Sequence, residues 1–262
     1  MKFAINHIAT PKLSLEDFFA LSRRLGISAV EIRNDLPDVV GSLPPEAVRT
    51  AAEAAGVEIL SINALYPFNV WLGDLPERAR ALADYAKACG ARALVMCPLN
   101  DGTEISYVDL VAALGAMAPI LRERGLIGLV EPLGFPVSSL RTKREAVAAI
   151  QASGAQDVYK LVHDTFHHHL AEEREIFPEW TGLVHISGVT DPEVAVKDML
   201  DAHRVLVDGD DRLENIVQLR QLKASGYTGP VSLEPFAAEI HDDPDFEAHL
   251  RASYAYVQQG LA

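Results

Sequence analysis

Four residues of metal-binding type lie at the ends of short apolar runs, each with the length and Val/Leu content of a buried parallel strand. They are Glu131 after Gly-Leu-Val, Asp164 after Lys-Leu-Val-His, His185 after Gly-Leu-Val and Glu234 after Pro-Val-Ser-Leu. The carboxyl ends of parallel strands in a β/α barrel meet on one rim. A lone strand-end carboxylate is more often a salt-bridge partner, but four such residues on successive strands predict a site for one divalent metal ion.

The donor set of this predicted site favours hard cations. Three carboxylates and a single imidazole suit Mn²⁺, Mg²⁺ or Co²⁺, and Zn²⁺ is a further alternative. Mn²⁺ is our first expectation.

Three consecutive histidines follow the predicted ligand Asp164. His167 lies one loop step beyond that strand and is expected to lean into the pocket. His168 and His169 are expected to begin the next helix at the surface. His163 alternates with Asp164 along the strand and is therefore expected to face the helices.

Other polar residues near the predicted strand ends are candidates for substrate binding. For His7, on the first strand, the floor of the pocket and a buried core position are equally favoured. A guanidinium group in the long loop after the seventh strand is suited to holding a substrate oxygen. The candidates are Arg33, Asn34, Asn63 and Arg204.

The elements that would position these residues alternate regularly along the chain. Strand-like segments cover residues 3–9, 29–33, 58–65, 93–98, 127–133, 159–166, 182–189 and 230–236. Amphipathic helical segments cover residues 15–25, 45–55, 76–89, 107–124, 143–152, 213–224 and 244–259, with a short one at 169–177. Ser14 is suited to cap the first helix, and Gly56, Gly90 and Gly125 to end later ones.

Eight β/α units of similar size with no linker predict a single (β/α)₈ TIM-barrel domain over residues 1–262. An open doubly wound sheet is the rival, but it usually has a glycine-rich turn after its first strand, and here that segment reads Asn-His-Ile-Ala-Thr-Pro. The longest non-helical stretch, residues 190–211, is typical of a loop that closes over a ligand.

Composition narrows the range of partners. A formal net charge of −14 without a basic cluster disfavours nucleic acid and anionic membranes. Two cysteines, Cys89 and Cys97, are too few for a disulfide framework and are expected to be reduced and buried. No apolar stretch approaches the ~20 residues that span a bilayer, so we expect a soluble cytoplasmic protein. The sequence leaves the oligomeric state open, with a homo-oligomer as one alternative.

Glu131, Asp164-Thr-Phe-His167, His185 and Glu234, in this order and on these strands, resemble the xylose-isomerase-like barrel superfamily of sugar isomerases and epimerases. Over essentially the whole chain, the sequence is most similar to the inosose (2-keto-myo-inositol) isomerases of inositol catabolism. The resemblance implies that Glu131, Asp164, His185 and Glu234 bind the metal, and that Glu131 and Glu234 are the catalytic acid/base pair. It also implies that His167 and Arg204 contact substrate oxygens.

This sequence differs from other members of the superfamily at two places that bear on the expected substrate and on the role of Arg204. Ketohexose 3-epimerases carry an acidic substrate-binding residue shortly after the first metal glutamate, where this sequence has Val137. The loop after the arginine often reads Pro-Gly-x-Gly in the family, whereas here Arg204 precedes Val-Leu-Val-Asp-Gly-Asp.

The expected activity is that of a metal-dependent isomerase, an intramolecular oxidoreductase that shifts the carbonyl of a cyclic polyol ketone through a cis-enediol. The same metal site could serve a ketose 3-epimerase, a hydroxypyruvate-type isomerase or an inosose-type dehydratase. The apurinic endonucleases of this barrel need more metal-binding histidines and a basic face, which the net charge disfavours. A barrel that only binds a polyol or a partner protein is the non-catalytic alternative.

Overall fold

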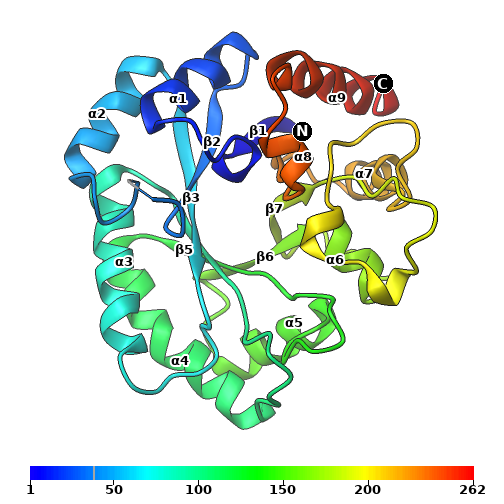
Figure 1. The fold of residues 1–262 in the computed structure, drawn as a ribbon. Helices are drawn as coiled ribbons and strands as arrows, with labels where there is room; N and C mark the ends of the chain where they lie inside the picture. Colours follow the sequence, from blue (N-terminus) through cyan, green and yellow to red (C-terminus); the bar gives the residue numbers. More distant parts are fainter. Residues whose placement is uncertain (38) are drawn as a thin grey trace.

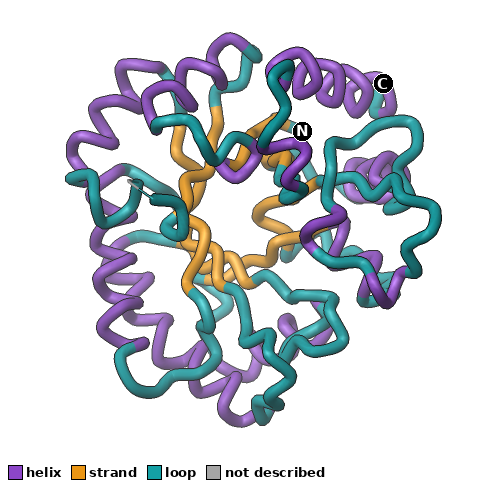
Figure 2. Tube along the Cα trace, in the orientation of Figure 1, coloured by secondary structure: helices purple, strands orange, loops and turns teal. Residues whose placement is uncertain are grey.

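The computed structural model describes residues 1–37 and 39–262. Eight parallel strands close into a barrel in chain order, and β1 pairs with β8. The prediction of a TIM barrel is therefore confirmed. Figure 2 shows the strands as a central ring with the helices outside it. The strands are β1 (Lys2–Asn6), β2 (Ala29–Arg33), β3 (Glu58–Leu65), β4 (Ala93–Met96), β5 (Ile127–Val130), β6 (Tyr159–Asp164), β7 (Thr181–Ile186) and β8 (Pro230–Leu233).

The helices cover the outside of the barrel, and the last of them, α9, returns to the side of β1 (Figure 1). Several end where the sequence indicated, because Gly56, Gly90 and Gly125 adopt positive φ angles at the helix ends. The α-helices are α1 (Leu15–Arg24), α2 (Pro45–Ala55), α3 (Leu75–Cys89), α4 (Tyr107–Arg124), α5 (Lys143–Ser153), α6 (Thr165–Leu170), α7 (Asn215–Ala224), α8 (Ala238–His241) and α9 (Phe246–Gly260).

Strand alternation separates the barrel interior into an apolar lower part and a polar upper part. The lower interior is a buried cluster of Ala93, Val95, Leu129, Val162 and Leu183. Two residues beyond the last cluster residue of each strand lie Cys97, Glu131, Asp164 and His185, because alternate residues of a strand point to the same face. The polar layer therefore lies at the carboxyl ends of the strands, above a filled apolar floor.

A separate apolar cluster packs under the loops on the β5–β7 side of the rim. It consists of Phe135, Phe166, Leu170, Val189, Met199 and Leu213, all buried. The loop between β7 and α7 contains two short 3-10 helices, η2 (Val196–Asp198) and η3 (Asp201–His203). This packing holds the loop against α6 and supports the residues of the rim.

The structure corrects the predicted ends of several elements. Predicted strands at residues 127–133, 159–166 and 230–236 end at Val130, Asp164 and Leu233, because the chain leaves the ladder to form the rim. Residues 7–9 form a 3-10 helix rather than the end of β1. The predicted helix at 169–177 is wrong, since α6 begins at Thr165, directly after β6.

No helix in the described part of the chain is long and apolar enough to cross a membrane.

Candidate metal centre

The four predicted metal ligands converge at one point on the rim. Glu131, Asp164, His185 and Glu234 are all buried, and one ligand atom from each lies within 4.8 Å of the others. Nδ1 of His185 lies 3.1 Å from Oε1 of Glu131 and 3.1 Å from Oε2 of Glu234. It lies 3.9 Å from Oδ2 of Asp164. Three carboxylates, at the ends of β5, β6 and β8, thus surround one imidazole nitrogen carried by β7.

Asp164 has a second task, since it also caps α6. Its Oδ1 accepts hydrogen bonds from the backbone N–H groups of Phe166 (2.7 Å) and His167 (3.1 Å). The cap holds this oxygen and leaves Oδ2 directed at the cluster. The register pairs Asp164 with His185 across β6 and β7, so their neighbouring positions follow from the sheet itself.

Glu31, in the middle of β2, contacts the other nitrogen of His185, and sequence reasoning did not assign it a role. Its carboxylate oxygens lie 3.1 and 3.2 Å from Nε2 of His185. The Ser61 hydroxyl donates to Oε2 of Glu31 over 2.6 Å. A signal was present in the sequence, because Glu31 is a polar residue near the end of an apolar run, as the four ligands are.

The two glutamates expected to act as acid and base have unlike surroundings. Oε1 of Glu234 accepts from Asn6 (3.0 Å), Arg33 (3.2 Å) and Asn63 (3.2 Å). By contrast, Oε2 of Glu131 has the thiol of Cys97 as its donor, at 3.4 Å. Glu234 is therefore firmly held, whereas one oxygen of Glu131 is bound only by a weak donor.

Cys97 consequently lies at the rim, where it packs against the apolar cluster of the barrel interior and is only partly buried, whereas the sequence predicted a buried thiol. Its side chain is partly accessible, whereas Cys89 is buried on α3. Burial and the neighbouring Glu131 carboxylate raise the pKa of the Cys97 thiol well above its usual value. The thiol is neutral at physiological pH and is suited to donate, not to attack.

Arg204 lies on the cluster. Its Nη2 donates to Oδ2 of Asp164 (2.7 Å) and to Oε2 of Glu234 (3.0 Å). The guanidinium carbon lies 5.0 Å from the ring centre of Phe166 and 4.7 Å from that of Phe236. In this structure Arg204 is 1% exposed, so a substrate that contacts it must reach it through the rim.

Arg33 and Asn63, also predicted to bind substrate, both lie beside Glu234. Arg33 makes a two-point ion pair with Asp35 in addition to its contact with Glu234. The side chain of Asn34 instead binds the backbone of Ala64, through its N–H and its carbonyl. Arg33 and Asn63 are thus brought to the cluster, whereas Asn34 holds two neighbouring strand ends together.

The charges of the buried cluster fit a divalent cation. Four buried carboxylates (Glu31, Glu131, Asp164 and Glu234) face two buried guanidinium groups, Arg33 and Arg204. Burial opposes protonation of His185, but the carboxylates of Glu234, Glu31 and Glu131 outweigh it and raise its pKa well above 6.5. Burial would raise the pKa of Glu234, but His185, Arg204 and Arg33 lower it. The excess negative charge and the oxygen-rich donor set are those that hold Mn²⁺, Zn²⁺ or a similar ion.

His167 reaches the same region without joining the cluster. It is 4% exposed, and its ring packs edge-on against Phe135 and Phe166. Its Nδ1 has no hydrogen-bond partner within the described residues. An unpaired buried nitrogen is costly, so this atom is a candidate for contact with a ligand.

His7, by contrast, is a core residue. Its ring stacks on Phe18 with the centres 4.3 Å apart, and Nε2 contacts the carbonyl of Leu13 at 3.1 Å. Burial lowers the pKa of His7 to about 4, so it is neutral. The alternative of a residue lining the pocket floor is not supported by these contacts.

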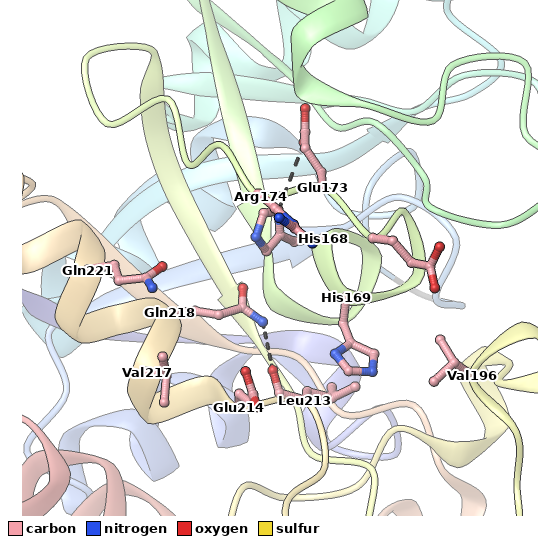
Figure 3. A pocket seen from close by; sticks show the side chains of 11 residues that line it. His168, His169, Glu173, Arg174, Val196, Leu213, Glu214, Val217, Gln218 and Gln221 are labelled. Atoms are coloured by element: carbon pink, nitrogen blue, oxygen red, sulfur yellow. Dashed lines mark hydrogen bonds and ion pairs between the residues drawn. The ribbon is translucent and has the colours of Figure 1, made fainter.

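His163 and His168 lie behind the site, among the helices. Nε2 of His163 contacts Gln218 of α7 at 2.9 Å, as the strand alternation predicted. The prediction of a surface position for His168 is wrong, because its side chain is 9% exposed and Nδ1 lies 2.6 Å from Nζ of Lys143. Figure 3 shows His168 and His169 lining a cavity of about 500 Å³ between α6 and α7, to which no residue of the metal cluster contributes.

Comparison with known proteins agrees with this geometry. Residues 19–256 match the xylose isomerase-like TIM barrel family. A xylose isomerase domain-containing protein from Salmonella typhimurium LT2 is 38% identical, with a TM-score of 0.92 over 99% of this chain and 97% of that one. The chain belongs to the xylose isomerase-like TIM barrel family. None of the curated proteins matches it.

More distant solved structures share the fold. The IolI protein with a bound zinc atom is 20% identical, with a TM-score of 0.87 over 100% of this chain and 98% of that one. D-Psicose 3-epimerase from Clostridium cellulolyticum H10 is 16% identical, with a TM-score of 0.78 over 100% and 99%. The fold is thus one used by sugar epimerases, and the buried cluster could hold one metal ion.

Proposed function

We propose that this protein is a metal-dependent isomerase that moves the carbonyl group of a cyclic polyol ketone, 2-keto-myo-inositol, to the neighbouring carbon in inositol catabolism. The observation that carries the proposal is the pair of buried glutamates on either side of His185, each 3.1 Å from its Nδ1. Two carboxylates at one centre provide one group that moves a proton between the neighbouring carbons and a second that moves a proton between their oxygens.

The four residues of the cluster would hold the ion, with Mn²⁺ as the first candidate. When bound, a divalent ion stabilises negative charge on the substrate oxygens and makes the neighbouring C–H acidic. In a six-membered ring, an α-hydroxyketone can form only a cis-enediol, so both oxygens lie on the same side. This geometry suits a compact site with ligands from adjacent strands.

The protein residues divide the proton transfers according to their surroundings. Glu131, with one oxygen bound only by a thiol, is the base that removes the proton from the hydroxyl-bearing carbon and returns it to the former carbonyl carbon. Glu234 accepts the hydroxyl proton of the first carbon as its C=O forms and passes it to the former carbonyl oxygen. Before the reaction Glu234 is ionised, because Asn6, Arg33 and Asn63 all donate to it, and it is therefore ready to accept that proton.

His167 and Arg204 bind substrate oxygens in this proposal, and Arg33 and Asn63 complete the polar wall. Support comes from the unpaired Nδ1 of His167 and from the position of Arg204 directly on the cluster. The substrate is a small polyol; nucleic acid and membrane partners are not part of the proposal. The chain acts as one domain over residues 1–262, and a homo-oligomer is compatible with this reaction.

The test is incubation of the Mn²⁺-loaded protein with 2-keto-myo-inositol in D₂O, followed by NMR. We expect the carbonyl to migrate and the substrate carbons to exchange hydrogen for deuterium. The extent of deuterium uptake depends on how fast the proton on the base exchanges with the solvent. If the carbonyl does not migrate and no deuterium is incorporated, the proposal is contradicted. Exchange with inversion at one carbon indicates an epimerase, and new ultraviolet absorbance indicates a dehydratase.

A further inference from the structure

A closed ring of hydrogen bonds and ion pairs joins two residues outside the metal-binding set to two residues within it. Nδ2 of Asn6 donates to Oε1 of Glu234 over 3.0 Å and to Oε1 of Glu31 over 3.4 Å. Glu31 contacts Nε2 of His185, and Nδ1 of His185 faces Glu234 at 3.1 Å. The ring therefore runs Asn6, Glu31, His185, Glu234 and back to Asn6.

The position of this ring follows from barrel closure. Its residues come from β1, from β2, from β7 and from the position directly after β8, and the two pairs of strands are neighbours only because β8 pairs with β1. The register places Asn6 opposite Glu31, and Glu31 opposite Ser61. All four ring residues are 3% exposed or less, so water does not compete for these contacts.

We propose that Asn6 and Glu31 are positioning residues that orient His185 and Glu234 toward the metal; the inference rests on the proposed metal-dependent function. An imidazole that donates its Nε2–H to Glu31 directs the Nδ1 lone pair at the cluster. The amide of Asn6 holds Oε1 of Glu234, and Oε2, which also accepts from Arg204, then faces Nδ1 of His185 in the cluster. Asn6 and Glu31 thereby determine which atom of Glu234 and which atom of His185 faces the metal.

Stability alone does not account for Glu31. Its carboxylate is fully buried, and burying a charge is costly unless it is paired. Replacing a buried ion pair by apolar residues is often neutral or stabilising, so the pairing of Glu31 with His185 does not by itself imply a role in stability. Asn6 also holds its own backbone turn, because its Oδ1 accepts from the N–H of Ile8 over 3.0 Å. The amide is therefore rigid before any ligand arrives.

The experiment compares Mn²⁺ affinity, by calorimetric titration of metal-free protein, in the wild type, Glu31→Gln and Asn6→Ser. Glutamine keeps the shape of Glu31 but removes its charge, and serine keeps an acceptor for Ile8 but lacks the bridging amide. Glu58→Gln is the matched control, because Glu58 begins β3, at the end of the barrel away from the metal cluster, and pairs with Lys2. The thermal midpoint of the metal-free proteins and the visible spectrum of the Co²⁺-loaded proteins are measured in parallel.

We expect about 10- to 100-fold weaker Mn²⁺ binding in Glu31→Gln and Asn6→Ser, with an altered Co²⁺ spectrum and an unchanged or higher metal-free midpoint. Unchanged Mn²⁺ affinity in both variants overturns the inference about Asn6 and Glu31 but leaves the proposed function intact. A loss of affinity that is matched by a fall in the metal-free thermal midpoint does the same. A wild type that takes up no divalent ion overturns the proposed function as well. If Glu31→Gln does not fold, Ser61→Ala, which releases one oxygen of Glu31, provides the same comparison.

Discussion

At the scale of single residues, Glu131 and Glu234 differ in what holds them. Both glutamates contact His185, but Glu234 is also surrounded by four N–H donors, from Asn6, Arg33, Asn63 and Arg204, whereas Glu131 has a thiol. Each donor to a carboxylate stabilises its charged form and weakens it as a base. This difference assigns the two glutamates separate parts in the proposed reaction.

Glu234→Gln is expected to keep the fold and lose turnover by about 10²–10⁴-fold, because the amide supplies neither charge nor a proton-transfer group. Steady-state kcat and circular dichroism measure the two effects. Glu239→Gln, an exposed position on α8, is the control and should behave as wild type. Activity within a factor of ten of wild type would remove Glu234 from the mechanism.

His167→Asn is expected to keep metal content and the thermal midpoint while weakening kcat/KM by about 1–3 kcal/mol, the usual range for a lost polar contact. The reason is the buried ring with an unpaired Nδ1 at the edge of the site. His169→Asn, in the neighbouring cavity, is the control. Lower metal occupancy would make His167 a ligand, and unchanged kinetics would leave it a packing residue.

At the scale of elements, α6 links the site to the outer helices. Its first residues bind Asp164, and the turn that follows brings Glu173 to Lys143 at the start of α5. Glu173 also accepts from the backbone N–H groups of Lys143 (3.1 Å) and Arg144 (2.9 Å). A buried ion pair therefore joins α5 to the segment that carries Asp164 and His167.

This ion pair gives a testable dependence of stability on pH. Burial would raise the pKa of Glu173, but His168 and the Lys143 ammonium lower it from 4.5 to about 2. A carboxyl whose pKa is lower in the folded state stabilises the fold fully above its unfolded pKa. That contribution is lost as the pH falls from about 4.5 toward 2.

Glu173→Gln is expected to lower the free energy of unfolding at pH 7 by on the order of 3 kcal/mol. The difference from wild type should shrink as the pH falls below about 4.5. Urea denaturation between pH 7 and 3 measures it, with Glu175→Gln on the exposed Arg144 pair as control. A difference that stays constant with pH would show that Glu173 acts through shape and not through charge.

At the scale of the whole molecule, barrel closure gathers the polar layer from all sides of the rim. Asn6 and Glu234 are 228 positions apart in the sequence and lie 3.0 Å apart between Nδ2 and Oε1. An ion at this point would join β5, β6, β7 and β8, the strands that carry the four ligands. Metal binding should therefore stabilise the entire barrel, and not one loop.

Addition of Mn²⁺ at about 100 times its Kd is expected to stabilise the folded protein by about 2.7 kcal/mol, because only the native state assembles the site. A chelator should reverse the shift, as seen by the thermal midpoint. In Asp164→Asn the shift should be strongly reduced, whereas Glu193→Gln, an exposed residue of the long loop, should retain it. No shift in wild type would count against a resident metal.

Much of the architecture was predictable because it depends on local patterns. The bounds of β2, β3, α2 and α4 agree with those predicted from apolar periodicity and capping residues. The strand-end positions of Glu131, Asp164, His185 and Glu234 likewise predicted that they meet, since parallel strands in a barrel share one rim. Here the sequence alone determined the class of fold and the location of the cluster.

Tertiary structure decided the partners of each side chain. Whether His185 is oriented by Glu31, or Glu234 is held by Asn6, depends on strand register and on the pairing of β8 with β1, which no local pattern encodes. The same holds for His168, where the position of α5 turned an expected surface histidine into a partner of Lys143. Alternation determines which face of a strand a residue occupies, but only the packed barrel determines which atom lies 3 Å away.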